Sequence, residues 1–540
     1  MLLQYCLIKS TLIKFYFWCY VQQPMLSSSR HSPLTAPPKK GKTENGPATP
    51  LWCVATTRVV DASGTMRDVV ISGGGGGGGN TGQMNGMAAQ WLGANKEGAR
   101  PVPLAPRPSI VRVGGDIVDD VAVSARGTVV CSTATQCFVA SLAPAAAGGD
   151  GTVSGRFVER GCFATEAADA NDAASNKVAF ARLGREGESE SEWLVTGGEK
   201  KVRLWLLSSR PVYPGAATKV AMATAKSTKL PDGWSALPRS AAAVDLKQAD
   251  SPVEGIAVWE GPSFSLVAVA LESTELHLWQ LRAADDGTKS NSGAGVPETK
   301  TSTPALPRGT DAPVVSLPKR THTSVAKLIC PGCVFVESSD HAFPYLVTCE
   351  QFKPKIVWGA KRSKSRVQPA TKIIVRQVDT VASSSADGKK GGGGADKIVL
   401  RTIAEISCGK SHVMCLAEAT AMLKACTHLP GSRASGAVGI AAGMNDGSVQ
   451  LYQLSKGGKL RLVAKVMVAT MPVRGMAFVE GGKVLAAVSP DSMLQLAAPA
   501  QFVEVKRGVS GIAVVIVLLA LLLLLIAMQQ GRVPGLKQDL

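Results

Sequence analysis

The chain repeats one small unit of short strand-forming runs, and this repetition constrains its fold more than any other feature. In each unit, short apolar runs alternate with turns of Gly, Asp, Ser or Asn, which is the pattern of antiparallel strands. A small sheet of this kind cannot bury both of its faces alone, so it must stack on its neighbours. The clearest units begin at Asp120, Lys177, Val253, Gly439 and Val473.

Radial stacking of such sheets produces a β-propeller. We add units near residues 51–93 and 325–378 and credit one unit to residues 397–454. The sequence therefore predicts an all-β, seven-bladed propeller over residues 51–500. The strand at residues 51–57 is expected to complete the last blade, whose recognisable strands end near Leu496.

Turns followed by a strand with a central Leu-Trp pair resemble the WD-repeat pattern. Leu204 with Trp205 and Leu278 with Trp279 are the two examples, although the Trp-Asp pair itself is missing. We therefore describe the predicted propeller as WD-repeat-like. A pair of β-sandwiches and a poorly ordered chain are the alternatives that the pattern leaves open.

A second constraint is an uncharged apolar stretch that begins at Val509 and ends at Met528. About 20 helical residues cover a hydrocarbon core of roughly 30 Å, and a helix satisfies its own backbone hydrogen bonds there. We expect a single membrane-spanning helix, with a buried core helix as the alternative. The long part before it is expected in the cytosol, because the twelve cysteines show no disulfide spacing and no Asn-x-Ser/Thr sequon occurs. Residues 529–540 would form a short tail on the other side.

The net charge is +18, which excludes neither a membrane surface nor nucleic acid as a partner. The sequence has no zinc-finger spacing, no basic region followed by heptads and no strand motif of stacking aromatics. We therefore predict no nucleic-acid partner. A basic domain beside a bilayer would be attracted to anionic headgroups.

Residues 1–50 are expected to precede the folded domain. The first 24 residues are apolar, but Lys9 and Lys14 interrupt them. The longest uncharged run that remains is too short to span a membrane. Translation from Met25, a membrane-surface segment and a signal peptide remain open for them. Residues 26–49 are rich in Ser, Pro, Lys and Gly, a composition typical of disorder.

Long inserts and weak motifs add little chemistry. Residues 285–313 and 381–397 are expected to be rim loops, and the basic run at 361–366 is either a solvated loop or a lipid or partner contact. The run from Gly409 to Ser411 fails as a phosphate-binding loop, because Ala404 stands where the first glycine belongs. Cys330 and Cys333 form a lone C-x-x-C, and no nucleophile-base pair is visible. The sequence thus indicates no covalent catalysis.

One connection between strands stands apart. Residues 68–72 and 87–92 read as strands, and Gly73 to Gly79 followed by a short polar segment join them. Glycine permits unusual backbone angles and exposes carbonyl groups. The run is either a flexible linker or a loop whose carbonyl oxygens bind a monovalent cation.

This layout resembles the endoplasmic-reticulum exchange factors for the Sar-family GTPase of the COPII coat, the prolactin regulatory element-binding protein family. The shared features are a first-blade strand, a glycine stretch, Gly-x-x-Asn, a second strand and a C-terminal membrane helix. The resemblance implies a potassium-binding loop and an asparagine needed for nucleotide exchange. Residue by residue, Gly73, Gly74, Gly75 and Gly76 match the glycine stretch, Gly82 matches the later glycine and Asn85 matches the asparagine.

The resemblance also implies the function. We expect a guanine-nucleotide exchange factor, not a covalent catalyst, that activates the Sar-type GTPase and starts COPII vesicle formation. It would span the endoplasmic-reticulum membrane once, with the propeller in the cytosol and residues 529–540 in the lumen. The final residues Lys537, Gln538, Asp539 and Leu540 resemble the K-D-E-L retrieval signal. A tail-anchored WD-type scaffold and a cargo-export accessory protein without exchange activity are the alternatives.

Overall fold

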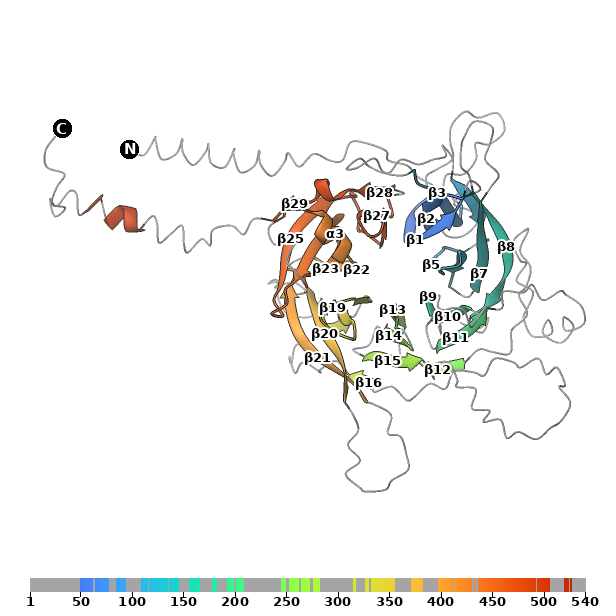
Figure 1. Ribbon diagram of the computed structural model, residues 1–540, viewed down its shortest axis with the longest axis horizontal. Coiled ribbons are helices and arrows are strands. Elements are labelled where there is room, and N and C mark those ends of the chain that lie inside the picture. Colours follow the sequence, from blue (N-terminus) through green and yellow to red (C-terminus); the bar gives the residue numbers. More distant parts are fainter. Residues whose placement is uncertain are drawn as a thin grey trace, which may run out of the picture.

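Seven antiparallel sheets stand around a common centre, as Figure 1 shows. The computed structural model describes residues 49–61, 64–76, 84–93, 108–114, 116–134, 136–144, 155–165, 177–181, 192–198, 201–207, 244–248, 252–261, 264–271, 275–281, 314–316, 326–329, 332–354, 371–381, 397–409, 411–429, 432, 436–491, 493–505, 519–523 and 525–526. The predicted seven-bladed, all-β propeller is confirmed for this part of the chain.

The first four blades follow the sequence in order. Blade 1 contains β1 (Leu51–Val60), β2 (Met66–Gly74), β3 (Gly86–Trp91) and β4 (Ser109–Arg112). Blade 2 contains β5 (Asp120–Val123), β6 (Thr128–Ser132), β7 (Gln136–Pro144) and β8 (Gly155–Ala164). Blade 3 contains β9 (Lys177–Ala181), β10 (Glu192–Gly197), β11 (Lys201–Leu207) and β12 (Val244–Gln248). Blade 4 contains β13 (Val253–Glu260), β14 (Ser265–Leu271), β15 (Glu275–Leu281) and β16 (Val314–Ser316).

The last three blades differ in strand number. Blade 5 contains β17 (Ala326–Ile329), β18 (Cys333–Val336), β19 (Tyr345–Pro354), β20 (Thr371–Val381) and β21 (Lys397–Ser407). Blade 6 contains β22 (Val413–Glu418), β23 (Val438–Met444), β24 (Ser448–Leu454), β25 (Leu460–Met467) and β29 (Val503–Glu504). Blade 7 contains β26 (Gly475–Val479), β27 (Val484–Ser489) and β28 (Met493–Ala497). A short helix, α3 (Thr420–Ala425), lies between β22 and β23, and the 3₁₀ helix η1 (Pro499–Gln501) precedes β29.

The innermost strands form the ring. Contacts run from β1 to β5, then through β9, β13, β18, β22 and β26 back to β1. Apart from β17 and β29, each strand pairs with the next in its blade, so connections from the second to the third strand and from one blade to the next share one rim. We call this rim the upper rim. Connections from the first to the second and from the third to the fourth strand lie on the opposite, lower rim.

The prediction that residues 51–57 complete the last blade is wrong. β1 pairs with β2 of its own blade, from Leu51 opposite Gly74 to Val60 opposite Met66. The ring closes instead by side-chain packing, in which Leu51 and Val70 of blade 1 meet Val484 and Val488 of blade 7 in one buried cluster. Each such side chain contributes about 1.5–3 kcal/mol when buried. Two hydrogen bonds cross the same joint: Thr56 Oγ1 donates to the Phe478 carbonyl at 2.8 Å, and the Glu480 amide donates to Asp68 Oδ2 at 3.1 Å.

The assignment of residues 397–454 to one unit is also wrong. β21 pairs with β20 along its whole length and therefore ends blade 5, while β22 begins blade 6. The two strands of this hairpin are separated in sequence by residues 382–396, so the pairing was hidden from a search for short turns.

Within the described residues, no helix is long and apolar enough to cross a membrane. Most of the stretch between Val509 and Met528 lies outside them; residues 519–523 and 525–526 are helical, and their Leu and Ile side chains are exposed. The membrane span therefore stays a prediction. The N-terminal residues 1–48 and the tail with Lys537, Gln538, Asp539 and Leu540 also lie outside the described residues, as do the inserts at 285–313 and 361–366. Of the predicted insert at 381–397, Val381 ends β20 and Lys397 begins β21, and the residues between them lie outside the described residues.

Candidate functional site

The glycine stretch begins inside the sheet of blade 1. Gly73 and Gly74 are the last residues of β2 and are paired with both β1 and β3. A Cβ atom on Gly73 would lie 2.6 Å from Cys53 Sγ, and one on Gly74 would lie 2.1 Å from the Pro50 carbonyl oxygen. These two glycines are therefore required for close packing at the end of the strand. The sequence had placed both in the loop.

Gly75 is held from two sides where the chain leaves the sheet. Its amide donates to the Pro50 carbonyl at 3.1 Å. Its carbonyl accepts a hydrogen bond from the Trp52 indole Nε1 at 2.9 Å. A Cβ atom on Gly75 would lie 2.1 Å from Asn85 Oδ1, so only glycine fits against the asparagine in this arrangement.

Asn85 anchors the other end of the same connection. Its side-chain Nδ2 donates to the Gly114 carbonyl at 3.4 Å, and its backbone carbonyl accepts from the Val113 amide at 3.2 Å. Both partners belong to the connection between blades 1 and 2. Asn85 is 5% exposed, so it is buried although it ends a connection on the rim. Asn85 ties the base of the glycine connection to the neighbouring connection on the upper rim.

The predicted potassium loop is described only in part. Gly82 and residues 77–83 as a whole lie outside the described residues. Of the others, Gly73 and Gly74 belong to the strand ladder, and the Gly75 carbonyl receives the Trp52 indole. The described glycines alone do not present a ring of carbonyl oxygens, so any cation would depend on residues 77–83. Potassium binding stays a prediction.

Two side chains that sequence reasoning missed complete the surroundings. Trp52, at the start of β1, braces Gly75, and the guanidinium of Arg474 lies over the Trp52 ring at 5.7 Å. Arg474 is exposed and precedes β26 of blade 7, so it lies on the upper rim. The two residues are far apart in the sequence, which gave no signal that they meet. Through Trp52, the exposed guanidinium of Arg474 is therefore part of the surroundings of the glycine connection.

The thiol behind the glycines is not a nucleophile. Burial raises the pKa of Cys53 well above its usual range, and the negative charge of Asp120 raises it further. A thiol in this setting stays protonated at neutral pH. Cys333 is likewise buried, with its thiol toward the Ala268 carbonyl, while Cys330 lies outside the described residues. The described residues contain no cluster of His, Cys, Asp or Glu that would hold a metal ion.

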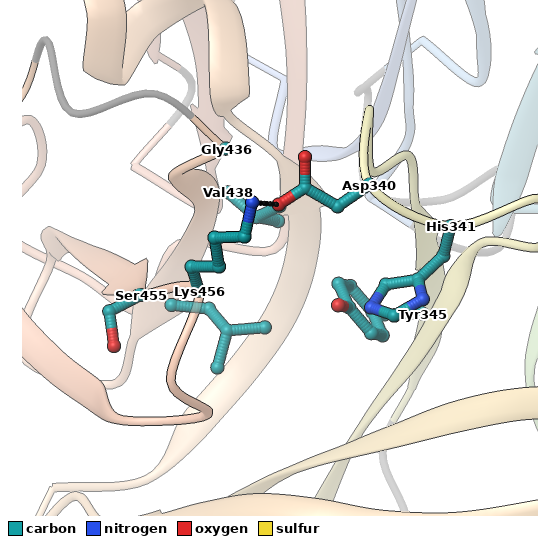
Figure 2. Close-up of a pocket in the computed structure, with 8 residues that line it drawn as sticks. Asp340, His341, Tyr345, Gly436, Val438, Ser455 and Lys456 are labelled. Atoms are coloured by element: carbon teal, nitrogen blue, oxygen red, sulfur yellow. Dashed lines mark ion pairs between the residues drawn. The ribbon is translucent and has the colours of Figure 1, made fainter.

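A separate cavity of about 310 Å³ lies on the lower rim, between blades 5 and 6 (Figure 2). The ion pair between Lys456 Nζ and Asp340 Oδ2, at 3.3 Å, crosses it, and the His341 and Tyr345 rings meet edge to face at 5.4 Å. Burial raises the pKa of the Tyr345 hydroxyl. The cavity shares no residue with the Asn85 site.

Comparisons with known proteins give only distant structural matches. No protein-family model matches the chain. No curated protein matches it. Sqt1 from Chaetomium thermophilum bound to the N-terminus of the ribosomal protein L10 matches at 13% identity and a TM-score of 0.39, over 85% of this chain and 88% of that one. The structure of Sqt1 alone gives the same identity and TM-score over 85% and 84%, and a chain of the mitotic checkpoint complex gives 10% and 0.36 over 80% and 86%. The fold assignment rests on the seven sheets themselves.

Proposed function

We propose that this protein is a guanine-nucleotide exchange factor for a Sar-type small GTPase at the endoplasmic-reticulum membrane. The observation that carries the proposal is the glycine connection of blade 1. Its two ends are fixed by Trp52 and by Asn85, and it emerges on the upper rim beside the exposed Arg474. A loop with a rigid base and a glycine-rich tip suits insertion into the nucleotide site of a partner.

Asn85 acts in this proposal as a positioning residue. Its side chain is buried, so it holds the loop through Gly114 and does not reach the partner itself. A loop whose two ends are already fixed loses less conformational entropy when it binds, and more of its binding free energy is available to deform the nucleotide site. Gly75 and Asn85 are packed so closely that no side chain fits on Gly75, so the two ends of the connection lie against each other.

The exchange step follows from the thermodynamic linkage between binding of the factor and binding of GDP to the GTPase. A factor that binds the empty GTPase more tightly than the GDP-bound form weakens GDP binding by the same factor. The loop would disturb the phosphate and magnesium contacts that hold GDP. Cellular GTP then displaces the factor by mass action. The chain forms no covalent bond in this cycle.

The membrane anchor belongs to the same proposal. The apolar stretch between Val509 and Met528 would hold the propeller on the cytosolic surface, where the GTPase is recruited. Confinement to one surface raises the effective concentration of the two partners without any additional contact.

The direct test measures GDP release from the cognate Sar-type GTPase with the full-length protein in vesicles. Asn85→Ala should slow release at least tenfold, which corresponds to about 1.4 kcal/mol of lost differential stabilisation. Asn85→Gln, which keeps the amide, should recover part of the rate.

The matched control is Asn445→Ala. Asn445 lies on the same rim in the corresponding connection of blade 6, and its Oδ1 accepts from the His412 amide at 3.0 Å in the preceding connection. This variant removes a similar hydrogen bond in blade 6, outside the glycine connection, and should leave release unchanged. Equal rates for the parent and Asn85→Ala, with both proteins folded, would show the exchange assignment to be wrong and leave the tail-anchored scaffold as the better proposal.

A further inference from the structure

The chain leaves the propeller at a fixed point on blade 6. β29 adds a fifth strand to the outer edge of that blade, with Val503 opposite Lys465 and Glu504 opposite Ala464. The next amide, of Val505, donates to the Val463 carbonyl at 3.0 Å. Phe502 is 2% exposed, and its carbonyl contacts His428 Nε2 at 2.8 Å. The position of Val505 is therefore set by the propeller itself.

Only three residues separate Val505 from Val509, the start of the apolar stretch. Whatever their conformation, four residue steps reach about 14 Å at most. The headgroup layer on one side of a bilayer takes up about 5–8 Å of that distance. If Val509 lies at the hydrocarbon boundary, β29 is within about 10 Å of the headgroup surface. A blade of four strands is about 15 Å wide, so a propeller that stands edge-on at β29 keeps the blades opposite blade 6 away from that surface.

The surface at this edge combines apolar and basic side chains. Val503 is 53% exposed, and Val399 of the adjacent outer strand β21 is 37% exposed. β25 and the turn before it contain basic residues and no acidic one: Lys456, Lys459, Arg461 and Lys465. Of the acidic neighbours, Asp340 is paired with Lys456, Glu405 with Lys372 and Asp446 with Lys465, and Glu504 lies on β29 itself. Exposed apolar side chains among lysines and arginines favour an interface with anionic lipid.

We propose that the outer edge of blades 5 and 6, formed by β21, β25 and β29, lies against the lipid surface and holds the propeller edge-on to the membrane. This inference rests on the membrane anchor in the proposed function, but not on nucleotide exchange. The edge-on orientation leaves the upper rim of blades 1 and 7 open to a GTPase that sits on the same membrane.

The test uses the full-length protein in vesicles that contain phosphatidylserine. A thiol-reactive fluorophore is placed at Val503→Cys or Val399→Cys, and lipids with a nitroxide headgroup serve as the quencher. The matched control is Val158→Cys, since Val158 is 42% exposed on β8, the outer strand of blade 2 across the ring. The parent protein gives the background from native thiols. Quenching at 503 and 399 should exceed that at 158 at least threefold, and quenching at 399 should fall when phosphatidylserine is omitted.

The outcomes separate the two proposals. If the protein resists alkaline extraction but positions 503 and 158 are quenched equally, the edge-on orientation is wrong while the anchor stands. If position 503 is protected from the lipid quencher, and only at high protein density, a second copy of the chain covers this edge. That result would also overturn the proposal. If alkaline extraction removes the protein from the vesicles, the anchor itself is wrong and the orientation fails with it, whatever the exchange assay shows.

Discussion

Gly75→Ala tests the geometry of the blade 1 site most directly. The new methyl carbon would lie 2.1 Å from Asn85 Oδ1 and 2.8 Å from Asn85 Cγ. Contacts this short force a neighbour to move, and Gly75 itself is held through Pro50 and Trp52. Overpacking of a buried site costs about 1–3 kcal/mol. Loss of the Asn85–Gly114 hydrogen bond adds about 1 kcal/mol.

The same substitution should cost far less when Asn85 is already alanine. Asn85→Ala removes both Oδ1 and Cγ, so the closest remaining contact is Asn85 Cα at 3.2 Å. We therefore expect a coupling free energy of about 1–3 kcal/mol between the two positions. Thermal unfolding of the parent, the two single variants and the double variant, in one detergent, measures it. GDP release by the same four proteins reports whether the exchange rate follows the displaced asparagine.

Gly457→Ala provides the control for the substitution itself, because a Cβ atom there meets nothing within 4 Å. It should change the free energy of unfolding by no more than about 0.5 kcal/mol. Additive effects of Gly75→Ala and Asn85→Ala would refute the close contact between the two residues, and with it the reasoning that the two ends of the glycine connection are coupled.

Three further expectations follow from the described residues. Arg376→Met leaves Glu350 buried without its partner at 2.9 Å and should cost about 3–5 kcal/mol in urea unfolding, whereas replacing both residues by Met should cost much less. Burial opposes ionisation of Asp446, but hydrogen bonds from Ser448 and Lys465 outweigh it and lower its pKa. The folded-state pKa is thus below the unfolded value, so the stability lost in Asp446→Asn should be present at neutral pH and vanish as the pH falls below about 4, as pH-dependent unfolding would show. Burial raises the pKa of the Cys162 thiol to about 11, so iodoacetamide at pH 8 should alkylate it at least about 100-fold more slowly in the native than in the unfolded protein, as peptide mass spectrometry would measure.

Much of the fold followed from local pattern. The alternation of short apolar runs and turns placed the starts of five units, in blades 2, 3, 4, 6 and 7, within two residues of the start of an observed strand, because the residues of one hairpin are neighbours in the sequence. The strands on either side of the glycine connection were also found. The family resemblance, and not strand pattern or a contact, identified Asn85 as the residue of interest.

Where distant segments meet, the sequence was misleading or silent. From the sequence, a strand that precedes the first turn fits the first blade or the last blade of a closed ring equally well. The observed pairing of β1 with β2 decides between them. The long separation of β20 from β21 hid their pairing. Nothing in the sequence indicated that β29 returns to blade 6, since two residues carry no periodicity.

In the blade 1 site, too, the sequence determined some features and the tertiary structure determined others. The sequence by itself determined that a glycine run joins two strands and that an asparagine follows it. Only the tertiary structure buried Asn85 under Gly114, placed the Trp52 indole on Gly75 and brought Arg474 over Trp52. The physical reason is that strand pattern is a local property of the backbone, whereas these contacts join blade 1 to the connections of blades 2 and 7, which meet only when the ring closes.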